Sequence, residues 1–122
     1  MSEDQELFLI VDDEPDLCWA LEYILKKHGH RTAWALSGQE ALELMQTHRF
    51  PLVFLDAKLP DLDGLEVARR MQALDPGLKI VMVSGYFYRD DVGIQEAFSR
   101  GLIRGFISKP FLQEEILNAI GN

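Results

Sequence analysis

Short apolar runs alternate with longer segments of helical periodicity, and this pattern repeats five times along the chain. Most of the runs are continuously apolar and rich in β-branched or aromatic residues, as expected of strands that are covered on both faces. The predicted strands are Leu7–Val11, Arg31–Ala35, Leu52–Leu55, Lys79–Ser84 and the weaker Gly105–Ile107. Arg31–Ala35 is the least apolar run, which predicts a strand at an edge of the sheet.

The five longer segments carry residues at helical spacing. Pro15 suits the first turn of the first helix and Gly29 ends it, while Ser37 with Glu40 indicates the start of the second. The turn signal at 75–77 ends the third. The stripes are Leu17, Leu21, Ile24, Leu25 and His28; Ala41, Leu42 and Met45; Leu65, Ala68, Met71 and Leu74; Ile94, Ala97, Phe98 and Leu102; and Leu112, Ile116, Leu117 and Ile120.

Strands that alternate with helices build a parallel sheet, so the predicted class is α/β, with a single doubly wound (βα)5 domain. The chain has 122 residues, of which 48% are hydrophobic, and this suffices for one compact domain but not for two. No linker or internal repeat interrupts the pattern. We therefore treat residues 1–122 as one domain with its core at about residues 6–121.

Charge and cysteine content limit the expected binding partners and the expected cellular compartment. Twenty acidic residues against twelve basic ones give a net charge of −8, which opposes direct binding to nucleic acid or an anionic membrane and favours cations or basic partner surfaces. The single cysteine, Cys18, cannot close an intramolecular disulfide, which suits a reducing compartment. The acidic start does not resemble a secretory signal, and no apolar run approaches the roughly 18 residues needed to span a bilayer. We expect a cytoplasmic protein.

Three aspartates stand at the ends of two predicted strands: Asp12 and Asp13 follow the first, and Asp56 follows the third. Right-handed crossovers bring the carboxyl ends of parallel strands to one edge, where ligands bind. If the two strands are neighbours, the gap is on the order of 5 Å, which is one strand spacing. Carboxylates that close either take up protons through raised pKa values or bind a divalent cation, for which Mg²⁺, or otherwise Mn²⁺, fits an all-oxygen shell. A carboxylate oxygen left free could then attack a phosphoryl group in line.

Two other strand ends add polar groups. Ser84 offers a hydroxyl donor and Gly85 permits close backbone approach, while Lys109 could pair with an aspartate and later with phosphate. Each has a plainer interpretation: helix capping for Asp12-Asp13-Glu14, a turn for Asp56, a turn or capping hydroxyl for Ser84 and a solvated side chain for Lys109. Five residues from four strand ends together favour a functional site. The Lys109-Pro110 peptide can be cis or trans.

With these residues assembled, nearly the whole chain resembles a receiver domain of bacterial two-component response regulators, of the chemotaxis-regulator type. The segments that carry the resemblance are Val11 to Pro15, similar to the family's acidic pair; Leu55 to Gly64, similar to its phosphoacceptor segment; Val83 to Gly85, with the switch hydroxyl; and Ser108 to Phe111, with the lysine motif. The resemblance implies a flavodoxin-like fold with parallel strand order 2-1-3-4-5.

The resemblance also implies roles. Asp56 would accept a phosphoryl group from a histidine kinase or a histidine phosphotransfer protein. Asp13 and Asp56 would ligate Mg²⁺ directly, Asp12 would act largely through water, and the Lys58 backbone carbonyl would complete the protein shell. Ser84 and Lys109 would bind phosphate oxygens. Phe106 matches an aromatic that swings inward when Ser84 moves, the alternative being a permanently buried core ring.

The implied output is a two-state surface of the fourth helix, fifth strand and fifth helix, which controls an output domain or protein and can support a homodimer. Self-phosphorylation and self-dephosphorylation would be the only chemistry, so the chain would not be an enzyme. Two features depart from the family. The segment 85–91 makes the fourth connection about three residues longer than usual, with aromatics that could cover the site. Lys58 stands where an apolar residue is common, and we expect it to be solvated.

Two other classes are less favoured. A degenerate receiver that acts as a metal-independent interaction module would not need every acid, the hydroxyl and the lysine, and all are present. A phosphatase with an aspartate nucleophile would need an Asp-x-Asp pair after the first strand, an inserted cap and a deep pocket, for which the chain has no segment. The sequence suits both a stand-alone receiver and one that belongs to a longer regulator or hybrid kinase.

Overall fold

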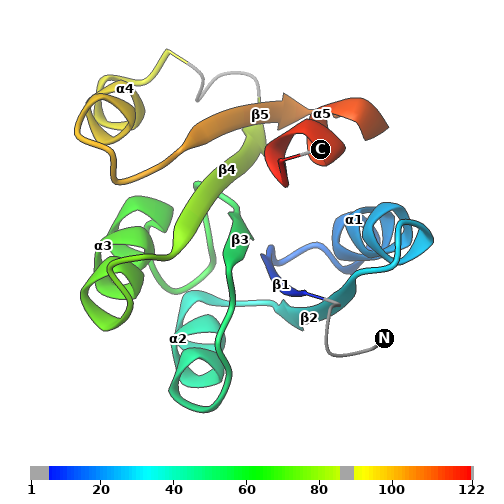
Figure 1. Cartoon of the computed structure of the whole chain (residues 1–122). Helices are drawn as coiled ribbons and strands as arrows, with labels where there is room; N and C mark the ends of the chain where they lie inside the picture. Colours follow the sequence, from blue (N-terminus) through cyan, green and yellow to red (C-terminus); the bar gives the residue numbers. More distant parts are fainter. Residues whose placement is uncertain (1–5, 86–89, 122) are drawn as a thin grey trace.

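The computed structural model describes residues 6–85 and 90–121, and in them five strands alternate with five helices (Figure 1). In chain order the elements are β1 (Leu7–Val11), α1 (Pro15–Lys27), β2 (Arg31–Ala35), α2 (Gly38–Thr47), β3 (Leu52–Leu55), α3 (Gly64–Leu74), β4 (Lys79–Gly85), α4 (Val92–Ser99), β5 (Gly105–Lys109) and α5 (Gln113–Ala119). Each predicted strand and helix is therefore confirmed, with differences at the ends.

The strands form one sheet in the order β2-β1-β3-β4-β5, and all neighbouring pairs are parallel. This is the predicted flavodoxin-like fold, and β2 lies at an edge as its composition indicated. The chain leaves β1 toward β2 on one side and returns to β3 on the other. The strand order thus reverses between β1 and β3, and ligands of open α/β sheets bind beyond the carboxyl ends of strands at such a point.

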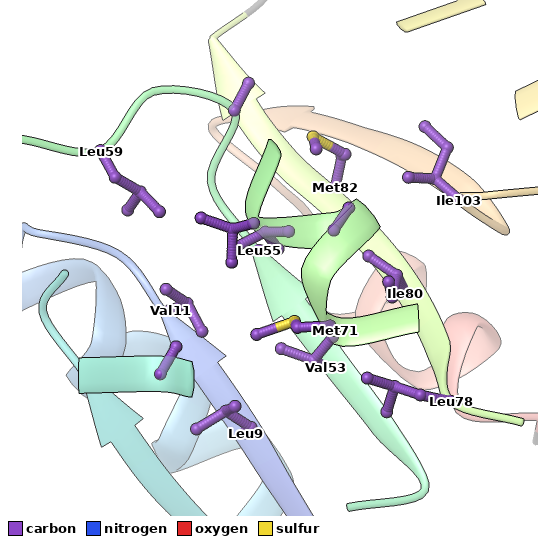
Figure 2. Close-up of a cluster of buried hydrophobic side chains, with 14 of the residues drawn as sticks. Leu9, Val11, Val53, Leu55, Leu59, Met71, Leu78, Ile80, Met82 and Ile103 are labelled. Atoms are coloured by element: carbon purple, nitrogen blue, oxygen red, sulfur yellow. The ribbon is translucent and has the colours of Figure 1, made fainter. Parts of the chain in front are cut away.

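Helices cover both faces of the sheet. Figure 1 shows α2, α3 and α4 on one face and α1 and α5 on the other. Alternate strand residues therefore enter two separate cores: Leu9 and Val11 belong to the core under α2, α3 and α4, whereas Phe8 and Ile10 face α1 and α5. Figure 2 shows the first core, in which Met71 of α3 lies over strands β1, β3 and β4. Burial on both faces explains why the strands read as continuous apolar runs.

The helix ends follow the sequence signals. Gly29 after α1 has φ of +86°, a left-handed conformation that glycine adopts without a Cβ penalty. The Ser37 hydroxyl accepts the Glu40 N–H at 3.1 Å, while the Glu40 carboxylate accepts the Leu36 N–H at 2.6 Å. The first bond satisfies a donor of the first turn of α2, and the second binds the backbone just before the N-cap. The predicted start of α2 is therefore confirmed.

Some apolar residues of the predicted stripes lie outside the cores. Strand β5 runs on to Lys109, and α4 ends at Ser99, so Leu102 falls beyond that helix. Leu74, Phe98 and Leu112 are 50%, 56% and 62% exposed. All three lie at or next to a helix end, and Leu112 is the N-cap of α5. None of the helices in the described part of the chain has the length and apolar character needed to cross a membrane.

Candidate functional site

The backbone places the predicted acids at the carboxyl ends of two neighbouring strands. The Asp56 N–H donates to the Val11 carbonyl at 2.9 Å, and the Asp12 N–H donates to the Ala35 carbonyl at 3.1 Å. Asp12 and Asp56 are buried, and Asp13 is exposed. Carboxylate oxygens of the three residues lie within 4.8 Å of one another. The predicted convergence across about one strand spacing is confirmed.

Ser84 and Lys109 approach these acids from β4 and β5. The Ser84 hydroxyl, which is buried, donates to Oδ1 of Asp56 at 2.7 Å. Lys109 Nζ lies 2.8 Å from Oδ2 of Asp12 and 3.5 Å from Oδ2 of Asp56. Both residues belong to their strands, where their backbones are fixed by the sheet. All five residues predicted from four strand ends therefore meet at one edge of the sheet.

The pairing of Asp12 with Lys109 sets the electrostatics of the site. Burial raises the pKa of Asp12 above its usual value, although the Lys109 ammonium and the Glu14 N–H favour the charged form. For Lys109 burial acts in the opposite direction, but the hydrogen bond to Asp12 and the charges of Asp12, Asp56 and Glu14 raise its pKa. Lys109 is therefore protonated at neutral pH and neutralises part of the acidic cluster.

An open pocket of about 420 Å³ lies over this cluster and is lined by Asp13, Glu14, Asp56, Lys58, Leu59, Pro60, Ser84, Gly85 and Lys109. The two lysines of this region, Lys58 and Lys109, are outnumbered by the carboxylates of Asp12, Asp13, Glu14 and Asp56, so negative charge remains in excess. The donors are hard oxygen atoms, and the exposed Asp13 leaves room for water on a bound ion. This donor set fits Mg²⁺, which prefers one or two carboxylates and keeps several waters.

Sequence patterns did not identify Glu14 as a member of the site. Its Oε1 lies 3.5 Å from Lys109 Nζ, although the two residues are 95 positions apart. Glu14 is the N-cap of α1, but its side chain makes no capping bond, and Asp12 accepts the Glu14 N–H at 2.9 Å instead. The helix-capping interpretation of this acidic run is therefore wrong for Glu14. A capping acid and a pocket acid look the same in sequence.

The segment after Asp56 folds back sharply to the start of α3. The Gly64 N–H donates to the Ala57 carbonyl at 2.9 Å, and a β-bridge joins Lys58 to Asp63. A Cβ atom on Gly64 would lie 2.3 Å from the Asp56 carbonyl oxygen, so only glycine fits there. The Lys58 side chain is exposed, as expected, while its N–H lies 3.4 Å from Oδ1 of Asp56.

Three other expectations concern the surroundings of the pocket. Phe106 of β5 is half-buried against the first core and, with Phe98 of α4, lines an apolar pocket of about 290 Å³. It is thus not the fully buried core ring of the alternative. The Lys109-Pro110 peptide is cis. The aromatics expected to cover the site, residues 86–88, lie outside the described residues.

Comparison with known proteins gives a consistent result. The model of the response regulator receiver domain family matches residues 8–121. Sporulation initiation phosphotransferase F of Bacillus subtilis is 35% identical over 115 residues, which cover 94% of this chain and 90% of that protein. Several other curated relatives are longer, and the chain spans only 19–47% of their length.

Solved structures of similar chains share the fold closely. A CheY-like response regulator receiver domain protein of Methanospirillum hungatei has a TM-score of 0.87 and 28% identity, covering 96% of this chain and 91% of that chain. The response regulator protein TrrA of Thermotoga maritima, solved in complex with Mg²⁺-BeF, has a TM-score of 0.82 and 28% identity, covering 95% and 96%.

Proposed function

Because this chain belongs to the response regulator receiver domain family, we propose that it is a phosphorylation-dependent signalling switch in which Asp56 accepts the phosphoryl group. The observation that carries the proposal is the convergence of Asp12, Asp13, Ser84 and Lys109 on Asp56. Among these carboxylates Asp56 has both a hydroxyl and an ammonium beside its two oxygens. A carboxylate so placed can act as a nucleophile toward phosphorus while the charge of the incoming group is balanced.

The proposed cation is Mg²⁺, with Mn²⁺ as a substitute. Asp13 and Asp56 would ligate it directly, Asp12 largely through water, and the Lys58 backbone carbonyl would complete the protein shell. When bound, the cation neutralises the carboxylates and anchors a phosphoryl oxygen. The all-oxygen cluster supports this assignment, as does the Mg²⁺-BeF complex of TrrA.

In the proposed transfer, a carboxylate oxygen of Asp56 attacks the phosphorus of a phosphohistidine on a histidine kinase or phosphotransfer protein. The P–N bond breaks, its electron pair stays on the imidazole nitrogen, and an acyl phosphate forms. Lys109, 3.5 Å from Asp56 Oδ2, stabilises charge on the transferred group. Water later hydrolyses the acyl phosphate and releases inorganic phosphate, so the chain is a phosphoacceptor rather than an enzyme that turns over substrates.

The proposed switch begins when the Ser84 hydroxyl gives up its hydrogen bond to Asp56 and donates to a phosphoryl oxygen instead. Phe106 then moves inward, and the surface of α4, β5 and α5 changes toward an output domain or protein, or toward a second copy of the chain. In this proposal residues 6–121 act as one receiver in the cytoplasm, where the free thiol of Cys18 stays reduced.

The proposal is tested by incubating the protein with a small phosphodonor and Mg²⁺ and measuring the intact mass. We expect one acid-labile phosphoryl group per chain, and none on Asp56→Asn or in the presence of a chelator. A degenerate receiver would remain unmodified. A phosphatase would instead release many equivalents of phosphate per chain before a phosphoryl group accumulates on it.

A further inference from the structure

The loop between Asp56 and α3, residues 57–63, is attached to α2 by one carboxylate. Oδ1 of Asp61 accepts the Gly38 N–H at 2.9 Å, and Oδ2 accepts the Gln39 N–H at 2.9 Å. These two bonds lower the pKa of Asp61. Asp61 is thus ionised at neutral pH and binds the positive end of the helix with both oxygens.

Helix α2 already has a cap of its own. Ser37 accepts the N–H of Glu40, the third residue of the helix, and Asp61 takes the N–H groups of the first two. The Asp61 bonds therefore do more than complete a local cap, because they join segments that are 22 and 23 positions apart. They tie the loop that carries Lys58 to a helix packed on the sheet.

Packing supplies a second, independent contact at the same place. A Cβ atom on Gly38 would lie 2.7 Å from Cγ2 of Val67 and 3.0 Å from Cδ1 of Leu62, so the first turn of α2 presses against this loop and α3. Leu59 of the loop is 7% exposed and belongs to the core drawn in Figure 2. The loop is thus held by Leu59 in the core and by Asp61 on α2.

We propose that Asp61 is a positioning residue for cation binding, which fixes the Lys58 backbone at the edge of the Asp56 pocket without lining that pocket itself. Lys58 lies between Leu59 and Asp56, and its N–H is 3.4 Å from Oδ1 of Asp56. A loop that is already ordered loses less conformational entropy when its carbonyl binds an ion. The inference rests on the proposed function because it uses the Lys58 carbonyl as a Mg²⁺ ligand.

The test compares two variants that each remove a cap of the same helix. Asp61→Ala releases the loop, whereas Ser37→Ala removes a bond within α2 and leaves the loop attached. We expect Mg²⁺ binding, measured by calorimetry, to weaken roughly fivefold in Asp61→Ala, the low end of coupling between separate sites, and to stay within about twofold in Ser37→Ala.

The variant Asp61→Asn distinguishes positioning of the loop from direct electrostatic attraction between the Asp61 carboxylate and the ion. The amide keeps one acceptor oxygen, so we expect a Mg²⁺ affinity between those of the parent and Asp61→Ala. Repeating the titrations at high salt screens any direct attraction between the Asp61 charge and the ion. A fivefold loss that disappears in salt would overturn positioning. Asp61→Asn also serves as the test variant if Asp61→Ala does not fold.

A second readout needs no metal. Amide hydrogen exchange at Lys58 and Gly64 in the metal-free protein should be about tenfold faster in Asp61→Ala than in Ser37→Ala, because local opening controls exchange. Equal exchange rates would overturn the inference. If the parent protein does not bind Mg²⁺, the proposed metal role fails, and this exchange measurement still decides whether Asp61 holds the loop. If the parent binds Mg²⁺ and Asp61→Ala binds it equally well, the inference fails and the proposed function stands.

Discussion

The Ser84 hydroxyl donates a 2.7 Å hydrogen bond to Oδ1 of Asp56, so neighbouring strands β3 and β4 are joined at their ends through two side chains. Both residues are buried and line the open pocket. A phosphoryl group that reaches Asp56 brings oxygen atoms that compete with Oδ1 of Asp56 for the Ser84 hydroxyl. In the proposed switch, this hydrogen bond is the one that phosphorylation would replace.

Replacing Ser84 by alanine tests that exchange. Ser84→Ala removes the hydroxyl that would donate to the transferred phosphoryl group, and a lost transition-state stabilisation of about 1–2 kcal/mol corresponds to roughly tenfold slower phosphorylation by a small phosphodonor. The rate is measured by intact mass over time. Ser84→Thr keeps the hydroxyl and should remain close to the parent. An unchanged rate in Ser84→Ala would show that the hydroxyl does not assist transfer.

Lys109 should act as the counter-ion of the metal-free pocket. In Lys109→Met the buried carboxylate of Asp12 loses its ion-pair partner, which typically costs about 3–5 kcal/mol. We expect a large loss of stability in urea without Mg²⁺ and substantial recovery when Mg²⁺ is added, because the cation then replaces the ammonium. Lys58→Met, at an exposed position on the same pocket, should change stability by less than about 0.5 kcal/mol. Equal destabilisation of Lys109→Met with and without Mg²⁺ would contradict this role.

Gly64→Ala should disturb the backbone under Asp56. The added Cβ would lie 2.3 Å from the Asp56 carbonyl oxygen and 2.7 Å from Cα of Ala57, so the strand end must shift. We expect about 2–4 kcal/mol of destabilisation in urea unfolding and reduced phosphorylation of the folded fraction. Gly105→Ala is the matched control, since a Cβ there meets nothing within 4 Å. A Gly64→Ala protein as stable as this control would show that the turn can relax.

Cys18 should be an unreactive thiol. It is fully buried, its Sγ lies 3.5 Å from the Asp12 carbonyl oxygen, and burial raises its pKa to about 12. At pH 8 iodoacetamide should label the native protein far more slowly than the protein in urea, because only the thiolate reacts. Comparable labelling of the two states would show that α1 opens readily.

The same shift predicts a pH dependence of stability. Above about pH 8.5 the unfolded thiol loses its proton while the folded thiol keeps it, so stability should fall with rising pH by up to about 1.4 kcal/mol per unit until pH 12 is approached. The urea midpoint between pH 8 and pH 10 measures this slope. Cys18→Ala removes the titrating group and should flatten it relative to the parent. Parallel slopes in the two proteins would assign the effect to other groups.

Much of the site could be predicted because strand ends are visible in the sequence. Asp12, Asp56 and Ser84 each stand at the end of a continuous apolar run, and the parallel topology brings such ends to one edge. The edge position of β2 followed from Arg31 and Thr32, which a strand covered on both faces would not carry. Period and position indicated the strand ends and the edge strand, whereas the family resemblance implied that the first and third strands are neighbours.

Other features depend on contacts that leave no local pattern. Glu14 next to Lys109, and Asp61 on the first turn of α2, join distant segments, and each acid also has an ordinary local role available. Phe98 continues the stripe of Ile94 and Ala97, yet it is exposed near the end of α4. Periodicity indicates a helix face but does not show how far the neighbouring sheet extends beneath it.

The contacts of Asp56 span large separations along the chain: Ser84 is 28 positions away and Lys109 is 53, and β5 reaches the pocket only through pairing with β4. A nascent or partly unfolded chain therefore carries Asp56, the proposed acceptor, without its companions, because such long-range contacts form late and at high entropic cost. Under the proposed function, competence to receive a signal is thus tied to completion of the whole sheet, and phosphorylation of Asp56 would itself report correct folding.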